Sequence, residues 1–200
     1  PKAKVKPSLP SATLASVGVF LQNDLRLHER LSLIVGGRWQ QVNSDARETV
    51  GFTTIPASDV QSTTVFATNA LFKVTEQLNL VASVGRGFRA PNLVERYFDG
   101  PTPEGSAYQS ATPGLKPEKS LNVDLGAKWR SDRFAAEAFV YRNDIHDAVR
   151  ISATGARINN LPEYRNVNIG KLRASGMEAT GTVLLVRGFM VSTNYSTVTS

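Results

Sequence analysis

Residues 120–129 read SLNVDLGAKW and alternate strictly between polar and apolar side chains. One set of alternate positions holds leucine, valine, alanine and tryptophan, whereas the other holds serine, asparagine, aspartate, glycine and lysine. A β-strand directs successive side chains to opposite faces, whereas a helix would mix the two sets around its circumference. The pattern therefore predicts a strand with one apolar and one polar face.

The same alternation recurs along the chain, strictly in some segments and more loosely in others. The predicted strands cover residues 13–25, 31–43, 64–74, 78–88, 120–129, 134–145, 164–185 and 189–198. No segment has a convincing helical pattern. We therefore expect an all-β protein with about eight antiparallel strands.

The predicted connections fall into two lengths that alternate along the chain. Short polar connections lie at 26–30, 74–77, 130–133 and 186–188, and long ones lie at roughly 44–62, 89–117 and 151–164. Short turns at one end and long loops at the other are typical of an outer-membrane β-barrel. A soluble sandwich has no reason to separate loop lengths in this way.

Aromatic side chains lie near both ends of the predicted strands. Those close to short turns are Phe72, Trp129, Phe134 and Phe189, and those near the opposite ends are Trp39 and Phe88. This placement favours two interfacial girdles of a membrane barrel. The alternative is that the rings fill the core of a sandwich, but core aromatics concentrate near strand centres.

Composition excludes several classes of protein. The 200 residues are 41% hydrophobic, and no apolar run is long enough for a transmembrane helix. The chain has no cysteine, so a thiolate metal site is excluded, and it has only two histidines. Its net charge of +6 is scattered along the sequence rather than gathered in a stripe, which disfavours nucleic acid as a partner. No catalytic motif is present, and we expect neither an enzyme nor a bound cofactor or metal.

Residues 85–129, GRGFRAPNLVERYFDGPTPEGSAYQSATPGLKPEKSLNVDLGAKW, resemble the central barrel segment of TonB-dependent receptors. Segments 18–40, 134–151 and 164–181 resemble neighbouring strands of that family, and Thr112 departs from its usual asparagine. The residues that match the family motifs are Gly87, Phe88, Arg89, Ala90, Pro91, Asn92, Pro113, Leu115, Pro117 and Glu118.

The resemblance implies an active importer in the outer membrane of a Gram-negative bacterium, with about eight strands of a larger barrel of about 22 strands. Residues 1–200 are then expected to be an interior part of the barrel domain. The family's plug domain, the terminal strands and the segment that contacts the TonB complex are not recognisable in this sequence. The alternative is a small, complete barrel of eight strands with a passive or structural role.

A ferric siderophore is the ligand that we prefer, and haem, cobalamin and a glycan are the alternatives. Haem receptors of the family carry a histidine in the loop that corresponds to 91–115, where this sequence has none. Tyrosine also binds haem iron, so Tyr97 and Tyr108, together with Arg89, are the candidate ligand contacts. An electropositive mouth would attract an anionic siderophore complex. The arginines expected there are Arg86, Arg89, Arg96, Arg157 and Arg165.

The polar faces of the predicted strands are expected to point into the lumen, towards the protein's own plug. The side chains placed there are Arg38, Gln40, Asn122, Asp124, Lys128 and Glu137. They either bind the plug or are solvated. Arg86 has the lipid-facing register and is expected to extend towards headgroups, so outer-membrane lipid and lipopolysaccharide are further expected partners.

Overall fold

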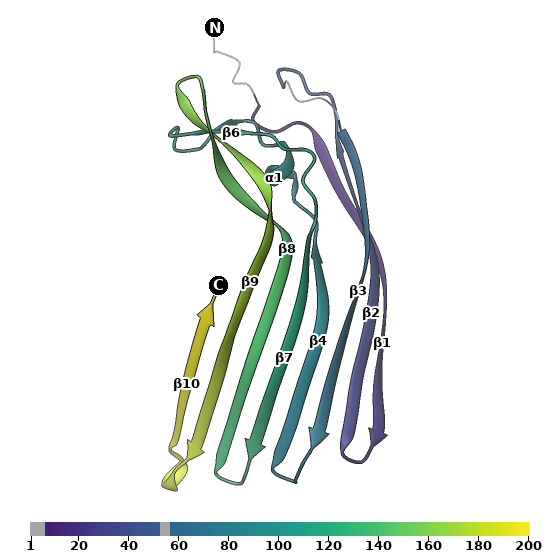
Figure 1. The fold of residues 1–200 in the computed structure, drawn as a ribbon, viewed down its shortest axis with the longest axis vertical. Coiled ribbons are helices and arrows are strands. Elements are labelled where there is room, and N and C mark those ends of the chain that lie inside the picture. Colours follow the sequence, from purple (N-terminus) through teal and green to yellow (C-terminus); the bar gives the residue numbers. More distant parts are fainter. Residues whose placement is uncertain (1–6, 53–56) are drawn as a thin grey trace.

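The computed structural model describes residues 7–52 and 57–200 and consists mainly of long strands (Figure 1). The long strands are β1 (Ala12–His28), β2 (Leu31–Ala46), β3 (Ala57–Lys73), β4 (Leu78–Arg89), β7 (Glu118–Arg130), β8 (Phe134–Ile158), β9 (Leu161–Leu184) and β10 (Met190–Thr199). The short elements are α1 (Leu93–Tyr97), β5 (Gly100–Pro101), β6 (Tyr108–Ser110) and the 3-10 turn η1 (Val186–Gly188). The eight predicted strands are thus confirmed. No helix in the described residues is long and apolar enough to cross a membrane.

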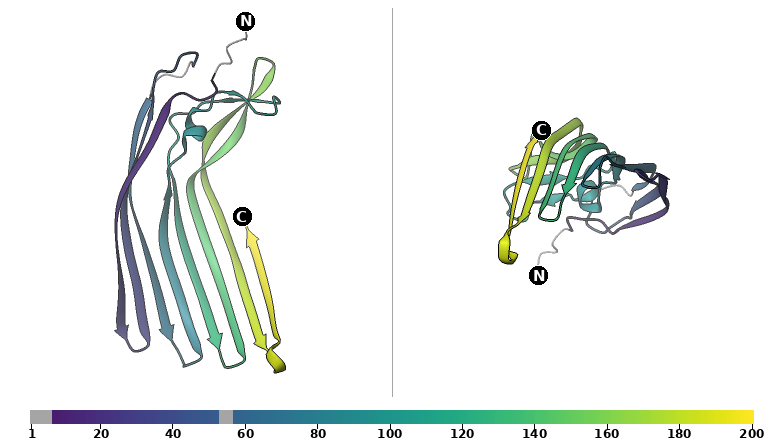
Figure 2. Two further views of the ribbon diagram at one scale, coloured as in Figure 1. Left: turned by 180° about the vertical axis from the view of Figure 1, so that it is seen from behind. Right: turned by 90° about the horizontal axis from the view of Figure 1, so that it is seen from below.

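The long strands form one antiparallel sheet in the order β1-β2-β3-β4-β7-β8-β9, and β10 pairs with β9. The sheet is curved, and α1 lies within the curve (Figure 2). In the described part of the chain, β1 and β10 do not pair with each other, so the sheet is open. The alternative of a closed barrel of eight strands is therefore not supported.

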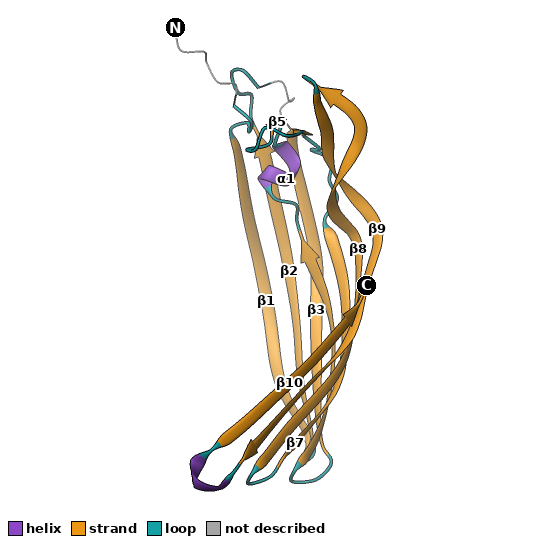
Figure 3. Cartoon of the chain, turned by 90° about the vertical axis from the view of Figure 1, so that its left-hand side faces the viewer, coloured by secondary structure: helices purple, strands orange, loops and turns teal. Residues whose placement is uncertain are grey.

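The short turns lie together at one end of the sheet, and α1 lies with the longer connections at the other end (Figure 3). The prediction of a long loop at 151–164 is wrong, because β8 and β9 continue to a two-residue turn at Asn159 and Asn160. These asparagines have φ angles of 50° and 65°, the left-handed values that a type I′ hairpin turn requires. Strands β2 and β3 likewise extend into the predicted loop at 44–62, of which 53–56 lie outside the described residues.

The loop at 89–117 is also more ordered than its sequence suggests. It contains the single-turn helix α1, although no helix is predicted from the sequence. Strand β6 pairs in parallel with the upper part of β9, beyond the region where β10 pairs with it. One edge of β9 is therefore shared between the returning loop and the last strand.

The strand register divides the sheet into two faces. Leu80 of β4 is opposite Ala127 of β7, and the positions two residues further along pair Ala82 with Leu125. The alternate positions pair polar residues, such as Ser83 with Asp124. The polar face is continuous with the one that carries α1, so we call it the inner face and the apolar one the outer face.

The outer face carries aromatic residues close to the short turns, as the girdle interpretation expects. Trp129 and Phe134 flank the β7–β8 turn with ring centroids 5.1 Å apart, and Phe72 is opposite Leu80 on the same face. All three rings are partly exposed. Exposed rings at the end of an apolar face suit the boundary between hydrocarbon and headgroups.

Two large inner-face rings lie against glycines on neighbouring strands. The ring of Phe139 occupies the space that a side chain at Gly126 would need, and the ring of Tyr141 similarly covers Gly176. Lys128 lies 5.5 Å from the centroid of Phe139 and forms an ion pair of 3.3 Å with Glu137. The glycines thus allow aromatic side chains to lie flat on the sheet.

We predict that Gly176→Ala destabilises the sheet. A Cβ at this position would overlap the backbone carbonyl of Thr197 on β10 and lie 2.6 Å from the hydroxyl of Tyr141. Overpacking of this kind costs about 1–3 kcal/mol of unfolding free energy. Heat-modifiable gel mobility of the full receptor in detergent measures the effect.

The matched control is Gly181→Ala on the same strand, where the nearest atom to the new Cβ is 3.6 Å away. That variant is expected to unfold at the wild-type temperature. Equal melting temperatures for the two variants would contradict the close approach described at Gly176.

Candidate functional site

The candidate site is the loop that leaves β4 at Arg89 and returns to β7 at Glu118. It folds back over the inner face instead of extending into solvent. The loop begins at Ala90, followed by Pro91, which cannot donate a hydrogen bond to a strand ladder. Pro91 is itself fully buried. The proline that predicts the end of the strand therefore also lies where the chain turns towards the inner face.

Helix α1 begins with a complete capping box. The side chain of Asn92 accepts a hydrogen bond of 2.9 Å from the backbone N–H of Glu95, and the Glu95 carboxylate accepts one of 2.8 Å from the N–H of Asn92. These bonds satisfy two backbone donors at the start of the helix. They also fix the carboxylate of Glu95 beside the end of β4.

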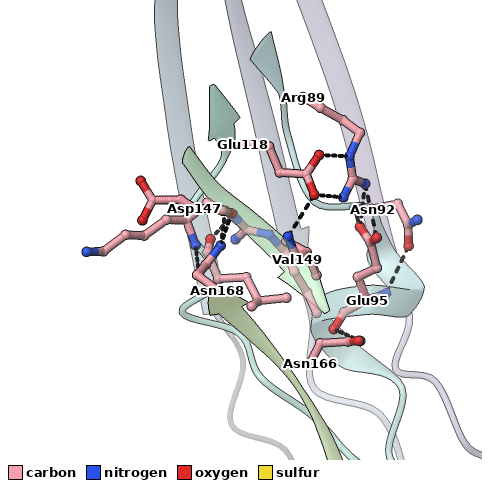
Figure 4. A network of polar contacts seen from close by, with 11 residues as sticks. Arg89, Asn92, Glu95, Glu118, Asp147, Val149, Asn166 and Asn168 are labelled. Carbon is pink, nitrogen blue, oxygen red and sulfur yellow. Dashed lines mark hydrogen bonds and ion pairs between the residues drawn. The ribbon is translucent and has the colours of Figure 1, made fainter. Parts of the chain in front are cut away.

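Arg89 joins the two ends of the loop (Figure 4). Its guanidinium donates two hydrogen bonds to the Glu118 carboxylate, at 2.6 and 2.7 Å, and further bonds to Glu95 at 2.9 and 3.0 Å. Glu118 also accepts a bond of 2.7 Å from the backbone N–H of Val149 on β8. A paired, bidentate arrangement of this kind is strong and directional. The network therefore connects β4, α1, β7 and β8.

The inward side of α1 is anchored by two fully or almost fully buried residues. Arg96 is 2% exposed and binds Asp59 of β3 at 2.7 Å as well as the carbonyl oxygens of Pro113 and Leu115. Tyr97 is 0% exposed, and its hydroxyl lies 3.4 Å from that of Ser44 on β2. A buried charge of this kind is tolerated because it is paired and hydrogen-bonded.

Two asparagines of β9 hold the outer part of the loop. Asn166 donates to the carbonyl oxygen of Glu95 at 2.9 Å (Figure 4). Asn168 accepts from the N–H of Lys116 and donates to its carbonyl oxygen, at 2.8 and 2.9 Å. Asn168 also donates to the carbonyl of Asp147, whose φ of 55° marks an irregularity in β8. The loop is thus tied to the long hairpin on its other side.

Glu163 forms a second anchor next to β6. It is 5% exposed and accepts hydrogen bonds from the hydroxyls of Ser110, at 2.5 Å, and Thr154, at 2.7 Å. Arg165 forms an ion pair of 2.9 Å with it. The Ser110 and Thr154 hydroxyls and the Arg165 guanidinium outweigh the opposing effect of burial and lower the pKa of Glu163 to about 2.

The three candidate ligand contacts lie in different surroundings. Tyr97, the last residue of α1, is fully buried, and its side chain has a structural role. Burial and the nearby carboxylate of Asp99 raise the pKa of Tyr108 to about 12. Arg89 is about half exposed and bonded to two carboxylates. Contact of any of them with a ligand stays a prediction.

The five arginines expected at the mouth differ in their partners. Arg89, Arg96 and Arg165 are ion-paired with carboxylates. Arg157 donates to the carbonyl oxygen of Asn160, and Arg86 lies on the outer face opposite Leu121. The partners of Arg89 and Arg96 include Glu118 of β7 and Asp59 of β3, which are distant in the sequence.

The register places all predicted lumen residues on the inner face. On β2, Gln40 lies on the same face as Val42 and Ser44, because these positions alternate along the strand. Asn122 is opposite Gly85, and Lys128 is opposite Glu137. The full set is Arg38, Gln40, Asn122, Asp124, Lys128 and Glu137. Their contact with a plug stays a prediction. In the described residues, no group of three or more histidine, aspartate or glutamate side chains is arranged to hold a metal ion.

We predict that Glu118→Ala loosens the loop, because the change removes both bonds to Arg89 and leaves the N–H of Val149 without its acceptor. The loss of such bonds costs about 1–3 kcal/mol, which corresponds to roughly fivefold to 150-fold faster hydrogen exchange in 90–99. Hydrogen exchange of the full receptor, read by mass spectrometry, measures this. Glu104→Ala, at an exposed position of the same loop, is the control. Unchanged protection in the Glu118 variant would show that the network does not hold the loop.

We predict that acid releases β6 from β9. The pKa of Glu163 is lower in the folded arrangement than its ordinary value of 4.5, so the stabilisation is present above about pH 4.5 and is lost as the pH falls towards 2. A spin label at exposed Ser106, in the turn before β6, should become more mobile over this range.

In Glu163→Gln, the same label should be mobile already at pH 7 and respond little to acid. Glu104→Gln is the control and should follow the wild type. A label whose mobility is independent of pH in the wild type would overturn the assignment.

The comparisons with known proteins agree with this geometry. The family model described as TonB dependent receptor-like, beta-barrel matches residues 5–200. The Ferric enterobactin receptor of Pseudomonas aeruginosa is 27% identical over 96% of this chain and 26% of its own length. The Heme/hemopexin utilization protein C of Haemophilus influenzae is 32% identical over 56% of this chain and 18% of its own length.

Among solved structures, the hemophore receptor HasR of Serratia marcescens superposes with a TM-score of 0.78 and 17% identity. The match covers 94% of this chain and 34% of that chain, and it shows a shared fold. The present chain thus spans about a fifth to a quarter of the length of the two curated relatives. The family and these neighbours are receptors and transporters rather than enzymes. The chain therefore belongs to the β-barrel domain family of the TonB-dependent receptors, proteins of the Gram-negative outer membrane.

Proposed function

We propose that this chain is part of an active importer of a ferric siderophore, powered through a plug and the TonB complex. The proposal rests on the loop between the family motifs. That loop contains no histidine between Pro91 and Leu115, and Tyr97, one of its two tyrosines, is fully buried. Such a loop offers hydrogen-bonding groups to a chelated iron rather than a protein ligand to haem iron.

The choice between a siderophore and haem depends on the surroundings of the two tyrosines. Iron ligation by tyrosine uses the deprotonated oxygen. Enclosure keeps Tyr97 away from the lumen, and burial together with the Asp99 carboxylate raises the pKa of Tyr108. A siderophore supplies all the iron ligands itself, so neither tyrosine needs to ionise. The Ferric enterobactin receptor, whose match covers 96% of this chain, has a name that supports the same ligand class.

Haem is the second candidate, because a relative with 32% identity over part of the chain is named for haem and hemopexin utilisation. Cobalamin and glycans are alternatives with no specific support from the loop. The mouth arginines do not separate these ligands, because three of them are paired with carboxylates.

The test uses the full-length receptor in an iron-starved Gram-negative strain that lacks its own siderophore and haem receptors. We expect growth with a ferric catecholate or hydroxamate siderophore, no growth with haem, and no growth in a strain without TonB. Growth with haem alone would overturn the siderophore assignment, and growth without TonB would overturn active import.

The variant Tyr108→Phe sharpens the test, because it removes the hydroxyl and keeps the ring. We expect siderophore-dependent growth within about twofold of wild type, because the ring surface is retained. If Tyr108 instead ligates haem iron, this variant should abolish growth on haem. Phe52→Tyr, at a partly buried position outside the loop, serves as the control for a change of one hydroxyl.

A further inference from the structure

We propose that an open edge of β8, beyond the end of β7, is a docking site for an extended, acidic segment of a protein partner outside the cell. The edge consists of residues 149–153, which we call the upper edge. This inference goes beyond the proposed function and does not depend on which iron complex is imported. It rests on the open backbone of this stretch, its exposure and the charge around it.

The β8–β9 hairpin extends past the end of β7 (Figure 1). The pairing of β7 with β8 ends where Lys119 lies opposite His146, whereas β8 continues to pair with β9 up to the hairpin turn. Between Ala148 and Ala153, β8 keeps a regular register with β9 on one side. On its other side, no strand of the described residues pairs with the upper edge. This stretch of β8 therefore has one paired and one open edge.

One hydrogen bond shows which backbone groups point to the open side. The N–H of Val149 donates to the carboxylate of Glu118 on β7, so it points away from β9 (Figure 4). In an antiparallel strand, the N–H and the carbonyl of one residue point to the same side, and every second residue repeats this direction. The register is regular from Val149 onwards, so the backbone groups of Ile151 and Ala153 also point to the open side. Both residues thus offer a donor and an acceptor to an incoming strand.

The upper edge is accessible to a partner. Every residue from Arg150 to Arg157 is exposed, and the exposed fraction of Ile151 is 50%. An exposed strand edge is a template for pairing with another chain. A peptide that adds a strand to such an edge gains main-chain hydrogen bonds and covers alternate side chains. Addition of a strand here would satisfy the open backbone groups and cover Ile151.

The charge around the upper edge favours an acidic segment. Arg150 and Arg157 of the hairpin are exposed, as is Lys116, whose backbone is hydrogen-bonded to β9. None of the three forms an ion pair with another described residue. The hairpin segment 147–158 has a single carboxylate, Asp147. The positive charge beside the open edge therefore exceeds the negative charge.

Other occupants fit this combination less well. A lipid headgroup or a free phosphate would bind the cations, but neither has a row of N–H and carbonyl groups to match a strand. A second copy of the hairpin would bring its own arginines beside Arg150 and Arg157, and like charges on paired strands are destabilising. Charged residues can also guard an edge against pairing. Here the two arginines flank residues 151–153 in the sequence, and the open backbone groups lie between them.

The test uses the full-length receptor in detergent and a short fluorescent peptide of alternating glutamate and valine. Fluorescence anisotropy measures its binding, and hydrogen exchange read by mass spectrometry locates the bound peptide. We expect saturable binding that slows exchange in 149–154. The fully N-methylated peptide keeps its charges but cannot donate to a strand, so its affinity should be about fivefold lower or less.

Two variants separate the backbone from the charge. Ala153→Pro removes an N–H that points away from β9, so the hairpin keeps its own ladder while peptide affinity falls roughly fivefold or more. Arg150→Gln, Arg157→Gln should lower the affinity roughly twofold to thirtyfold, because two exposed ion pairs with the peptide are lost. The matched control is Arg130→Gln, Arg133→Gln, which removes two exposed charges at the short-turn end and should bind the peptide like the wild type.

Several results would overturn the proposal. These are an absence of saturable binding, equal affinity for the N-methylated peptide, slowed exchange only outside 149–154, and an equal loss of affinity in the control variant. Binding of rough-type lipopolysaccharide at this edge in place of the peptide would identify a lipid as the occupant and would also contradict it. Wild-type heat-modifiable mobility establishes that the variants are folded. If Ala153→Pro does not fold, the N-methylated peptide and the arginine variant decide the outcome.

Discussion

The pairing of backbone hydrogen bonds within the sheet is the constraint on which the rest of this structure depends. In hydrocarbon, a backbone N–H or carbonyl has no water to bind, so each strand must be paired along its membrane-spanning length. Paired strands have two faces, and one of them must meet lipid. Leu80, Leu125 and Val140 lie on that face, whereas Asp124 and Lys128 lie on the other. Every later feature of the molecule is built on this division.

The division explains which parts of the fold are predictable from sequence. Between the short turns and the level of Arg89 and Glu118, lipid on one side and a polar interior on the other impose alternation, and the sequence predicts the strands there. Above that level, both faces meet polar surroundings, so β8 and β9 continue to pair without an alternating pattern. The predicted loop at 151–164 is wrong for this reason. The adjacent asparagines at 159 and 160 were a readable hairpin signal, because both adopt positive φ.

The candidate site was only partly predictable. The motifs mark Arg89 and Glu118, but 29 positions separate them, and no sequence pattern states that they face each other across two strands. Helix α1 has five residues, too few to show a helical period. Its capping pair, Asn92 and Glu95, has the three-residue spacing of a capping box and could have located the helix start. The long-range partners, such as Asp59 for Arg96, depend on the register of strands that are distant in sequence.

The arginines of the two faces have different roles, and the difference lies in their partners. On the inner face, Arg89 and Arg96 bind carboxylates from other segments, so the positive charge is spent within the protein and the loop is fixed. On the outer face, Arg142 and Arg173 share one carboxylate, so charge remains for the surroundings. Composition reports the sum of both sets and cannot separate them. The net charge of this chain can therefore be interpreted only after the register has assigned each arginine to a face and the ion pairs have shown which charges are balanced within the protein.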